Sequence, residues 1–164
     1  MPAPSGNAPA GGSPSSRVDA LGIELPAAPS PLGSYVEASD AGGVLFISGT
    51  LPVVKGKLAI SGRLGENLTV KEGREAARIA SLNALAAAKE HVGDLDRLKK
   101  LIKLTVVMAT TDHFTDHAAV GDGASELFAQ IFGRQPGHTR MVYGVQSLPK
   151  GAPVVVETIF EISP

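Results

Sequence analysis

The residue whose type and setting most clearly suggest chemistry is Arg140, a single arginine at the start of an apolar run. The stretch from Gly137 to Ile162 reads GHTRMVYGVQSLPKGAPVVVETIFEI. A permanently charged guanidinium is costly to bury unless an anion meets it. It can hold a carboxylate by two parallel charge-assisted hydrogen bonds. Arg140 therefore indicates either a carboxylate-binding site or a structural charge, in a salt bridge between subunits or at the solvent-exposed rim.

A second polar group occupies the sequence DHFTDH, which contains Asp112, His113, Asp116 and His117. Two histidines four residues apart could bind zinc from one face of a helix. No His-Glu-x-x-His pattern occurs, and Thr115 or Asp116 could instead cap a helix start. We expect a helix start and no metal. No phosphate-binding glycine motif is present either, so we expect no nucleotide and no other cofactor.

The four histidines and several serines permit a nominal Ser-His-Asp triad, but no G-x-S-x-G turn follows a strand. A serine hydrolase is therefore not expected. His138 lies two residues before Arg140, on the same face if the strand has already begun there. It could flank an Arg140 site or be an exposed histidine of a turn.

Composition limits the function classes. The chain has 164 residues, enough for one domain, and its 15 basic and 16 acidic side chains nearly balance, so nucleic acid is not an expected partner. No cysteine and no long apolar run occur, which suits a cytoplasmic protein away from membranes. Residues 1–16 are uncharged and rich in Pro, Gly, Ala and Ser. They predict a disordered leader before a domain at 17–164.

The elements that must position these residues begin with β-strands. Two glycine-bounded strands are predicted within 33–49, joined at the turn from Asp40 to Gly43, and a hairpin with a Lys-Gly turn follows. A Thr-x-x-Glu capping box at Thr69 starts a helix over 70–92, which has an alanine-rich face. Gly93 ends that helix.

The second half predicts a strand over 100–110, a helix over 118–132, and a closing hairpin over 137–162 around Leu-Pro-Lys-Gly. The fold class is α+β, with two helices on one face of a mixed, mostly antiparallel sheet. Side chains alternate between the two faces along a strand, and this alternation suggests that the last two strands share one face that no helix covers. A partly apolar face of this kind predicts self-association. The residues expected on it are Arg140, Val142, Gln146, Val155, Glu157 and Ile159.

Several segments, in order, resemble the Rid superfamily, also called YjgF or endoribonuclease L-PSP-like proteins. They are GSYVEA, LFISGTLP, SLNALAA, HFTDHAAVGDGASELFAQIFG, HTR and LPKGAPVVVE, and the resemblance extends over residues 18–162. The DGASELF to HTR block is more similar to a branch divergent from the founding imine deaminases. The resemblance implies a single chorismate-mutase-like domain that forms a homotrimer.

The resemblance also implies an activity, the cofactor-free hydrolysis of 2-imino or enamine acids to 2-keto acids and ammonia between subunits. It implies that Arg140 binds the substrate carboxylate, and that Tyr35, Ser48 and Gly49 line the same pocket. The expected ligand is therefore a small carboxylate, an imino or keto acid.

The chain departs from the deaminases at four positions: Thr50 replaces a glutamine, Gly121 an asparagine, Val142 a cysteine and Val155 a glutamate. Valine cannot accept a proton, so Glu157, two residues further on, is the predicted catalytic group. Three hypotheses remain: a Rid-like hydrolase, a non-catalytic binder of small carboxylates, and an endoribonuclease, the last disfavoured by the balanced charge.

Overall fold

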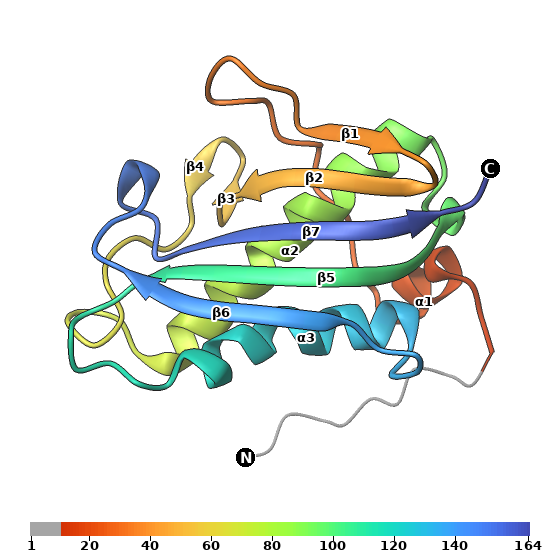
Figure 1. Ribbon diagram of the computed structural model, residues 1–164. Coiled ribbons are helices and arrows are strands. Elements are labelled where there is room, and N and C mark those ends of the chain that lie inside the picture. The colour runs from red at the N-terminus through yellow and green to blue at the C-terminus, as the bar shows by residue number, and fades with distance from the viewer. Residues whose placement is uncertain (1–10) are drawn as a thin grey trace.

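A computed structural model describes residues 11–164. It contains the two strands that were predicted between glycines near the start of the domain (Figure 1). β1 (Ala38–Ala41) and β2 (Val44–Thr50) pair antiparallel across the predicted turn, where Gly42 has a φ of 58°. β3 (Val53–Val54) and β4 (Lys57–Leu58) form a small separate hairpin. The segment over 38–58 is therefore built of β-strands, as predicted.

The long helix α2 (Val70–Val92) has the predicted bounds because local signals define both ends. The backbone N–H of Glu72 donates to Thr69 Oγ1 at 3.2 Å, and the N–H of Thr69 donates to Glu72 Oε2 at 2.7 Å. Gly93 ends the helix at a φ of 84°. Its alanine-rich face is buried against the sheet, where small side chains allow close packing.

The predicted closing hairpin is wrong. β6 (Thr139–Val145) and β7 (Val154–Ile162) do not pair, because β5 (Leu98–Ala109) lies between them in the sheet order β1-β2-β7-β5-β6. β6 runs parallel to β5, and β7 runs antiparallel to both β5 and β2. The chain from β5 to β6 passes through α3 (His117–Phe132), the helical crossover that a parallel pair requires. The 3₁₀ turn Pro149–Gly151 then carries it past the end of β5.

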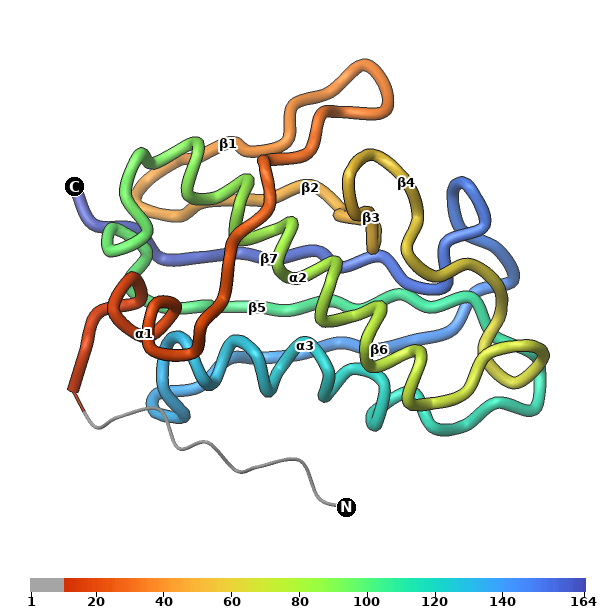
Figure 2. Tube along the Cα trace, turned by 180° about the vertical axis from the view of Figure 1, so that it is seen from behind, coloured from red at the N-terminus to blue at the C-terminus, as the bar shows by residue number. Residues whose placement is uncertain are grey.

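The helices cover one face of the sheet, as Figure 2 shows from the helix side. The short helix α1 (Pro14–Ala20) packs beside α3 and begins inside the stretch predicted as leader. Residues 1–10 of that stretch lie outside the described residues. Apolar side chains of the opposite face are exposed, among them Phe46, Met141 and Tyr143, at 48%, 54% and 46%. No helix of residues 11–164 covers this open face (Figure 1).

Candidate functional site

Arg140 lies on β6, at the edge of the sheet, with its side chain directed at α3. Its register partner on β5 is Leu104, which is fully buried beneath the helices. Arg140 Nη1 donates to Asp122 Oδ1 at 2.7 Å and to Ser125 Oγ at 3.2 Å, and Nη2 donates to the Ala118 carbonyl at a long 3.5 Å. The guanidinium is thus fixed by the first half of α3.

One edge of this guanidinium stays available. Asp122 and Ser125 both accept hydrogen bonds from Nη1, whereas Nε makes no hydrogen bond within residues 11–164. The Nε and Nη2 donors form one of the two edges through which arginine binds a carboxylate with two parallel bonds. The Arg140 side chain is 25% exposed. It can therefore accept an external anion without first breaking its bond to Asp122.

His138 lies beside this cluster and is partly buried, so it is not the exposed turn histidine of the second prediction. Ser125 Oγ and His138 Nε2 are 2.9 Å apart. Burial, and then the positive charge of Arg140, lower the pKa of His138 below its ordinary value. The lowered pKa favours the neutral imidazole, whose Nε2 accepts from or donates to Ser125 Oγ according to its tautomer. Arg140, Asp122, Ser125 and His138 are named the Arg140 cluster below.

Glycine at position 121 allows β6 to approach α3 closely. A Cβ atom at Gly121 would lie 2.7 Å from Val142 Cγ1 and 3.3 Å from Arg140 Nη1. Real Cβ atoms do not approach other atoms to 2.7 Å, so a larger residue would push the strand and the guanidinium away. Gly121, noted in the sequence only as a departure from the deaminases, is therefore a packing requirement of the Arg140 cluster.

The predicted common face for Arg140 and Glu157 is wrong. In the register, Arg140 pairs with Leu104 and Leu104 with Thr158, which is also buried. Glu157 pairs with Thr105 instead and is exposed on the open face. Parity gives the relative orientation within one strand, not between two strands, so the sequence could not exclude this error. Glu157 and Arg140 of one chain lie on opposite faces of the sheet.

Two further corrections concern the same six residues. Val142 faces α3 together with Arg140, whereas Val155 contacts Gly49 on the open face: a Cβ atom at Gly49 would lie 2.7 Å from Val155 Cγ1. Ile159 lies four residues after Val155 on the same strand, so both side chains point to the open face, and both are half-buried. Gln146 follows the end of β6 and does not belong to either strand face.

Tyr35, Ser48 and Gly49 lie near the other edge of the sheet. The backbone N–H of Leu32 donates to the Tyr35 hydroxyl at 2.9 Å, and Ser48 Oγ donates to the Val36 carbonyl at 2.7 Å. β7 and β5 separate β2 from β6, and three strand spacings amount to about 14 Å. One chain therefore does not bring these residues to Arg140.

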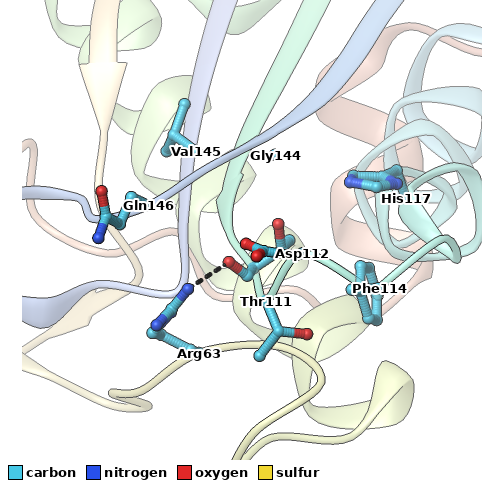
Figure 3. A pocket seen from close by; sticks show the side chains of 9 residues that line it. Arg63, Thr111, Asp112, Phe114, His117, Gly144, Val145 and Gln146 are labelled. Atoms are coloured by element: carbon cyan, nitrogen blue, oxygen red, sulfur yellow. Dashed lines mark hydrogen bonds between the residues drawn. The ribbon is translucent and has the colours of Figure 1, made fainter.

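A cavity of about 520 Å³ opens at the ends of β5 and β6 (Figure 3). Arg63 and Gln146 lie on one side of it, Phe114 and His117 on the other, and Asp112 between them. Arg63 Nη2 donates to the Thr110 carbonyl at 2.6 Å. Asp112 and His117 belong to the polar group singled out in the sequence, whereas Arg63 lies in a loop without a motif and was not predicted. The cavity contains no member of the Arg140 cluster.

The remaining polar residues predicted near this end are part of a helix start. α3 begins at His117, and Asp116 occupies its N-cap position without a side-chain capping bond. Within residues 11–164, no three His, Asp or Glu side chains are grouped to hold a metal ion. None of the helices in the same range is long and apolar enough to cross a membrane.

Comparison with known proteins decides the family. A family model described as "YjgF/chorismate_mutase-like, putative endoribonuclease" matches residues 15–162. The chain belongs to this YjgF/Rid family. The resemblance is thereby confirmed, and so is the chorismate-mutase-like α+β fold.

The YjgF/Rid chain is similar to proteins from distant organisms. "Protein TCP17" of Trypanosoma cruzi is 40% identical over 144 residues, which cover 87% of this chain and 90% of that protein. A 2-iminobutanoate/2-iminopropanoate deaminase of Dermatophagoides farinae is 29% identical over 140 residues, 85% of this chain and 94% of the relative. These matches cover nearly the whole YjgF/Rid domain.

Two solved structures show the same architecture. A crystal structure from Shewanella oneidensis MR-1, described as a "putative endoribonuclease", is 37% identical, with a TM-score of 0.88 over 92% of this chain and 100% of that one. Escherichia coli TdcF with bound serine is 25% identical, with a TM-score of 0.59 over 86% of this chain and 98% of that one. The YjgF/Rid family thus includes a member seen with a small carboxylate compound.

Proposed function

We propose that this YjgF/Rid protein binds small 2-keto or 2-imino carboxylates at Arg140. The observation that carries the proposal is the geometry of the guanidinium: α3 fixes Nη1, Nη2 makes only a long 3.5 Å bond to the Ala118 carbonyl, and Nε makes no hydrogen bond within residues 11–164. A fixed fork of this kind loses little entropy when it binds a carboxylate. The deaminase and the serine-bound TdcF among the relatives support this ligand class.

The proposed site lies between subunits of a homotrimer. Tyr35, Ser48 and Gly49 are near the edge of the sheet that lies opposite Arg140. The β6 edge of one subunit can meet this edge of another, which would join the two halves of the site. The exposed apolar side chains of the open face support assembly, because burying Phe46 and its neighbours releases water from apolar surface. In such an assembly, Glu157 could reach Arg140 only across a subunit boundary.

The proposed reaction is hydrolysis of a 2-imino or enamine acid to a 2-keto acid and ammonia. The alternative is a non-catalytic carboxylate binder in the same site. That alternative is favoured by Val142 and Val155, which supply no polar group where the deaminases have one. An endoribonuclease is the least supported function, because the chain has no excess of positive charge for a phosphate backbone.

Binding and turnover separate these functions. Calorimetric titration with 2-oxobutanoate should show saturable binding that Arg140→Ala removes and Arg78→Ala preserves. Arg78 lies on α2 and makes no side-chain hydrogen bond within residues 11–164, so it is a matched loss of charge. For turnover, a dehydratase acting on threonine generates 2-iminobutanoate, and release of 2-oxobutanoate is followed. Keto-acid binding that is equal in both variants contradicts the site, and binding without acceleration leaves the non-catalytic binder.

A further inference from the structure

The cavity at the ends of β5 and β6, named the Arg63 cavity below, is a polar recess separate from the Arg140 cluster (Figure 3). We propose that it is a second ligand site, which binds the zwitterion of a free amino acid with its carboxylate at Arg63 and its ammonium group at Asp112. Binding there does not depend on a ligand at Arg140. Gly144 lines the cavity and lies four residues after Arg140 on β6, so about 13 Å of strand separate the two sites.

Arg63 and Asp112 give the cavity two opposite charges that no ion pair neutralises. Both residues line it, and none of the four ion pairs within residues 11–164 includes either of them. The guanidinium of Arg63 makes one hydrogen bond in the same range, from Nη2 to the Thr110 carbonyl at 2.6 Å, so Nη1 is left as a donor. A zwitterion complements both charges, whereas a simple anion or cation meets one charge of its own sign.

The cavity has the size and the polar wall that a small polar ligand needs. Its volume of about 520 Å³ lies within the range of about 300–1,000 Å³ found for small-molecule sites. Thr110 is 8% exposed, and its hydroxyl makes no hydrogen bond within the part of the chain that the structure describes. Buried hydroxyls are normally hydrogen-bonded. A ligand with a polar side chain would supply the partner that this hydroxyl lacks.

Gly144 keeps this wall open to a ligand. A Cβ atom at Gly144 would meet Thr110 Oγ1 and would lie 2.8 Å from His117 Nε2. The hydroxyl and the imidazole therefore lie over bare backbone, close to each other on one side of the cavity. They form a polar surface for the side chain of the ligand, next to the two charged residues that bind its main-chain groups.

The walls of the cavity are held in place by contacts within the chain. The N–H of Leu64 donates to the Ala109 carbonyl at 2.9 Å, and its carbonyl accepts from the N–H of Thr111 at 3.0 Å. These bonds join the loop that carries the guanidinium to the end of β5. On the opposite wall, the rings of Phe114 and His117 meet edge to face, with their centroids 5.2 Å apart. A site that is already ordered loses little entropy when it binds.

L-Asparagine is the probe, because its side-chain amide can both donate to and accept from the Thr110 hydroxyl and the Gln146 amide of the wall. Succinamate is asparagine without the amine, and 3-aminopropanamide is asparagine without the carboxyl group. Titration calorimetry should show saturable binding of asparagine. Each fragment should bind about tenfold or more weakly, since each loses one hydrogen bond between charged groups.

Two variants test the charged residues. Asp112→Asn removes the negative charge and keeps a side-chain oxygen, and this exposed, unpaired residue is not needed for folding. It should weaken asparagine binding by about tenfold or more, whereas Asp19→Asn on α1 should not. Arg63→Gln should act in the same way, with Arg78→Gln on α2 as its control. Equal Tm values of Asp112→Asn and the wild type show that a loss of binding is not a loss of folding.

Three results would overturn the second site. They are the absence of saturable asparagine binding by the wild type, asparagine binding that survives Asp112→Asn, and equal affinities for asparagine and succinamate. The last of these would indicate a simple anion site.

Arg140→Ala separates the two proposed sites. It should remove 2-oxobutanoate binding and leave asparagine binding unchanged. Loss of asparagine binding in Arg140→Ala would place the amino acid at Arg140 and overturn the second site. Asparagine binding by a wild type that does not bind 2-oxobutanoate would overturn the proposed function and leave the Arg63 cavity as a ligand site.

Discussion

At the proposed site, Asp122 would compete with the ligand carboxylate for Arg140, and its neutralisation should tighten binding. Its carboxylate accepts from Arg140 at 2.7 Å and cancels the charge that an external carboxylate needs. Asp122→Asn keeps a side-chain oxygen as acceptor, so Arg140 remains oriented, but it removes the negative charge. We therefore expect a lower dissociation constant for 2-oxobutanoate.

The size of the effect follows from the geometry. A carboxylate on the Nε and Nη2 edge would lie about 6 Å from the Asp122 carboxylate, judged from charge-assisted bond lengths. At that separation the repulsion is about 0.7 kcal/mol in water and about 3 kcal/mol at an effective dielectric constant of 20. Asp122 is 47% exposed, which favours the lower value. A change of about 1 kcal/mol corresponds to roughly fivefold tighter binding.

Calorimetry at two ionic strengths tests this prediction, with Asp19→Asn as the control. Asp19 is an exposed residue of α1, so its variant has the same change in net charge far from Arg140. The gain should shrink at about 1 M salt, where the screening length is about 3 Å. Unchanged or weaker binding by Asp122→Asn at low salt would refute the competition between Asp122 and the ligand.

Three further predictions concern stability and assembly. Thr69→Ala removes the cap of α2 and should cost about 1 kcal/mol, lowering the calorimetric Tm by about 2–4 °C; an unchanged Tm would contradict the capping role. Phe46→Glu places charges on the open face, so light scattering should give the mass of one chain, against a multiple of it for the wild type; a wild-type monomer would refute assembly. Burial and Arg140 lower the folded pKa of His138, so the unfolded state takes up the proton first as the pH falls below about 6.5. The free energy of unfolding should therefore decrease below that pH, and urea titrations of His138→Gln should show a flatter dependence.

The sequence predicted elements well where the determining contacts are local. α2 has the predicted bounds because Thr69, Glu72 and Gly93 satisfy backbone groups within a few residues. The predicted closing hairpin is wrong because the Leu-Pro-Lys-Gly turn indicates only that the chain reverses direction. It does not indicate which strands pair. β5 enters between β6 and β7 through contacts distant in sequence, and no local pattern encodes this insertion.

The candidate site likewise combines a residue that the sequence indicated with residues that it did not. Arg140 was selected from its charge in an apolar run, and its role as the carboxylate anchor stays a prediction. Its partners Asp122 and Ser125 were missed, because polar residues inside a helix have many uses and only the packing of α3 on β6 selects these two. The roles of Tyr35, Ser48, Gly49 and Glu157 remain predictions.

The crossover from β5 through α3 to β6 places every member of the Arg140 cluster in one continuous segment of the chain. The cluster therefore forms from short-range connections, whereas the β1–β2 edge comes from a separate region near the N-terminus. Substitutions in one segment can therefore change the Arg140 cluster while the β1–β2 edge is left unchanged. The β5–α3–β6 segment can thus vary in sequence while the remainder of the sheet is maintained.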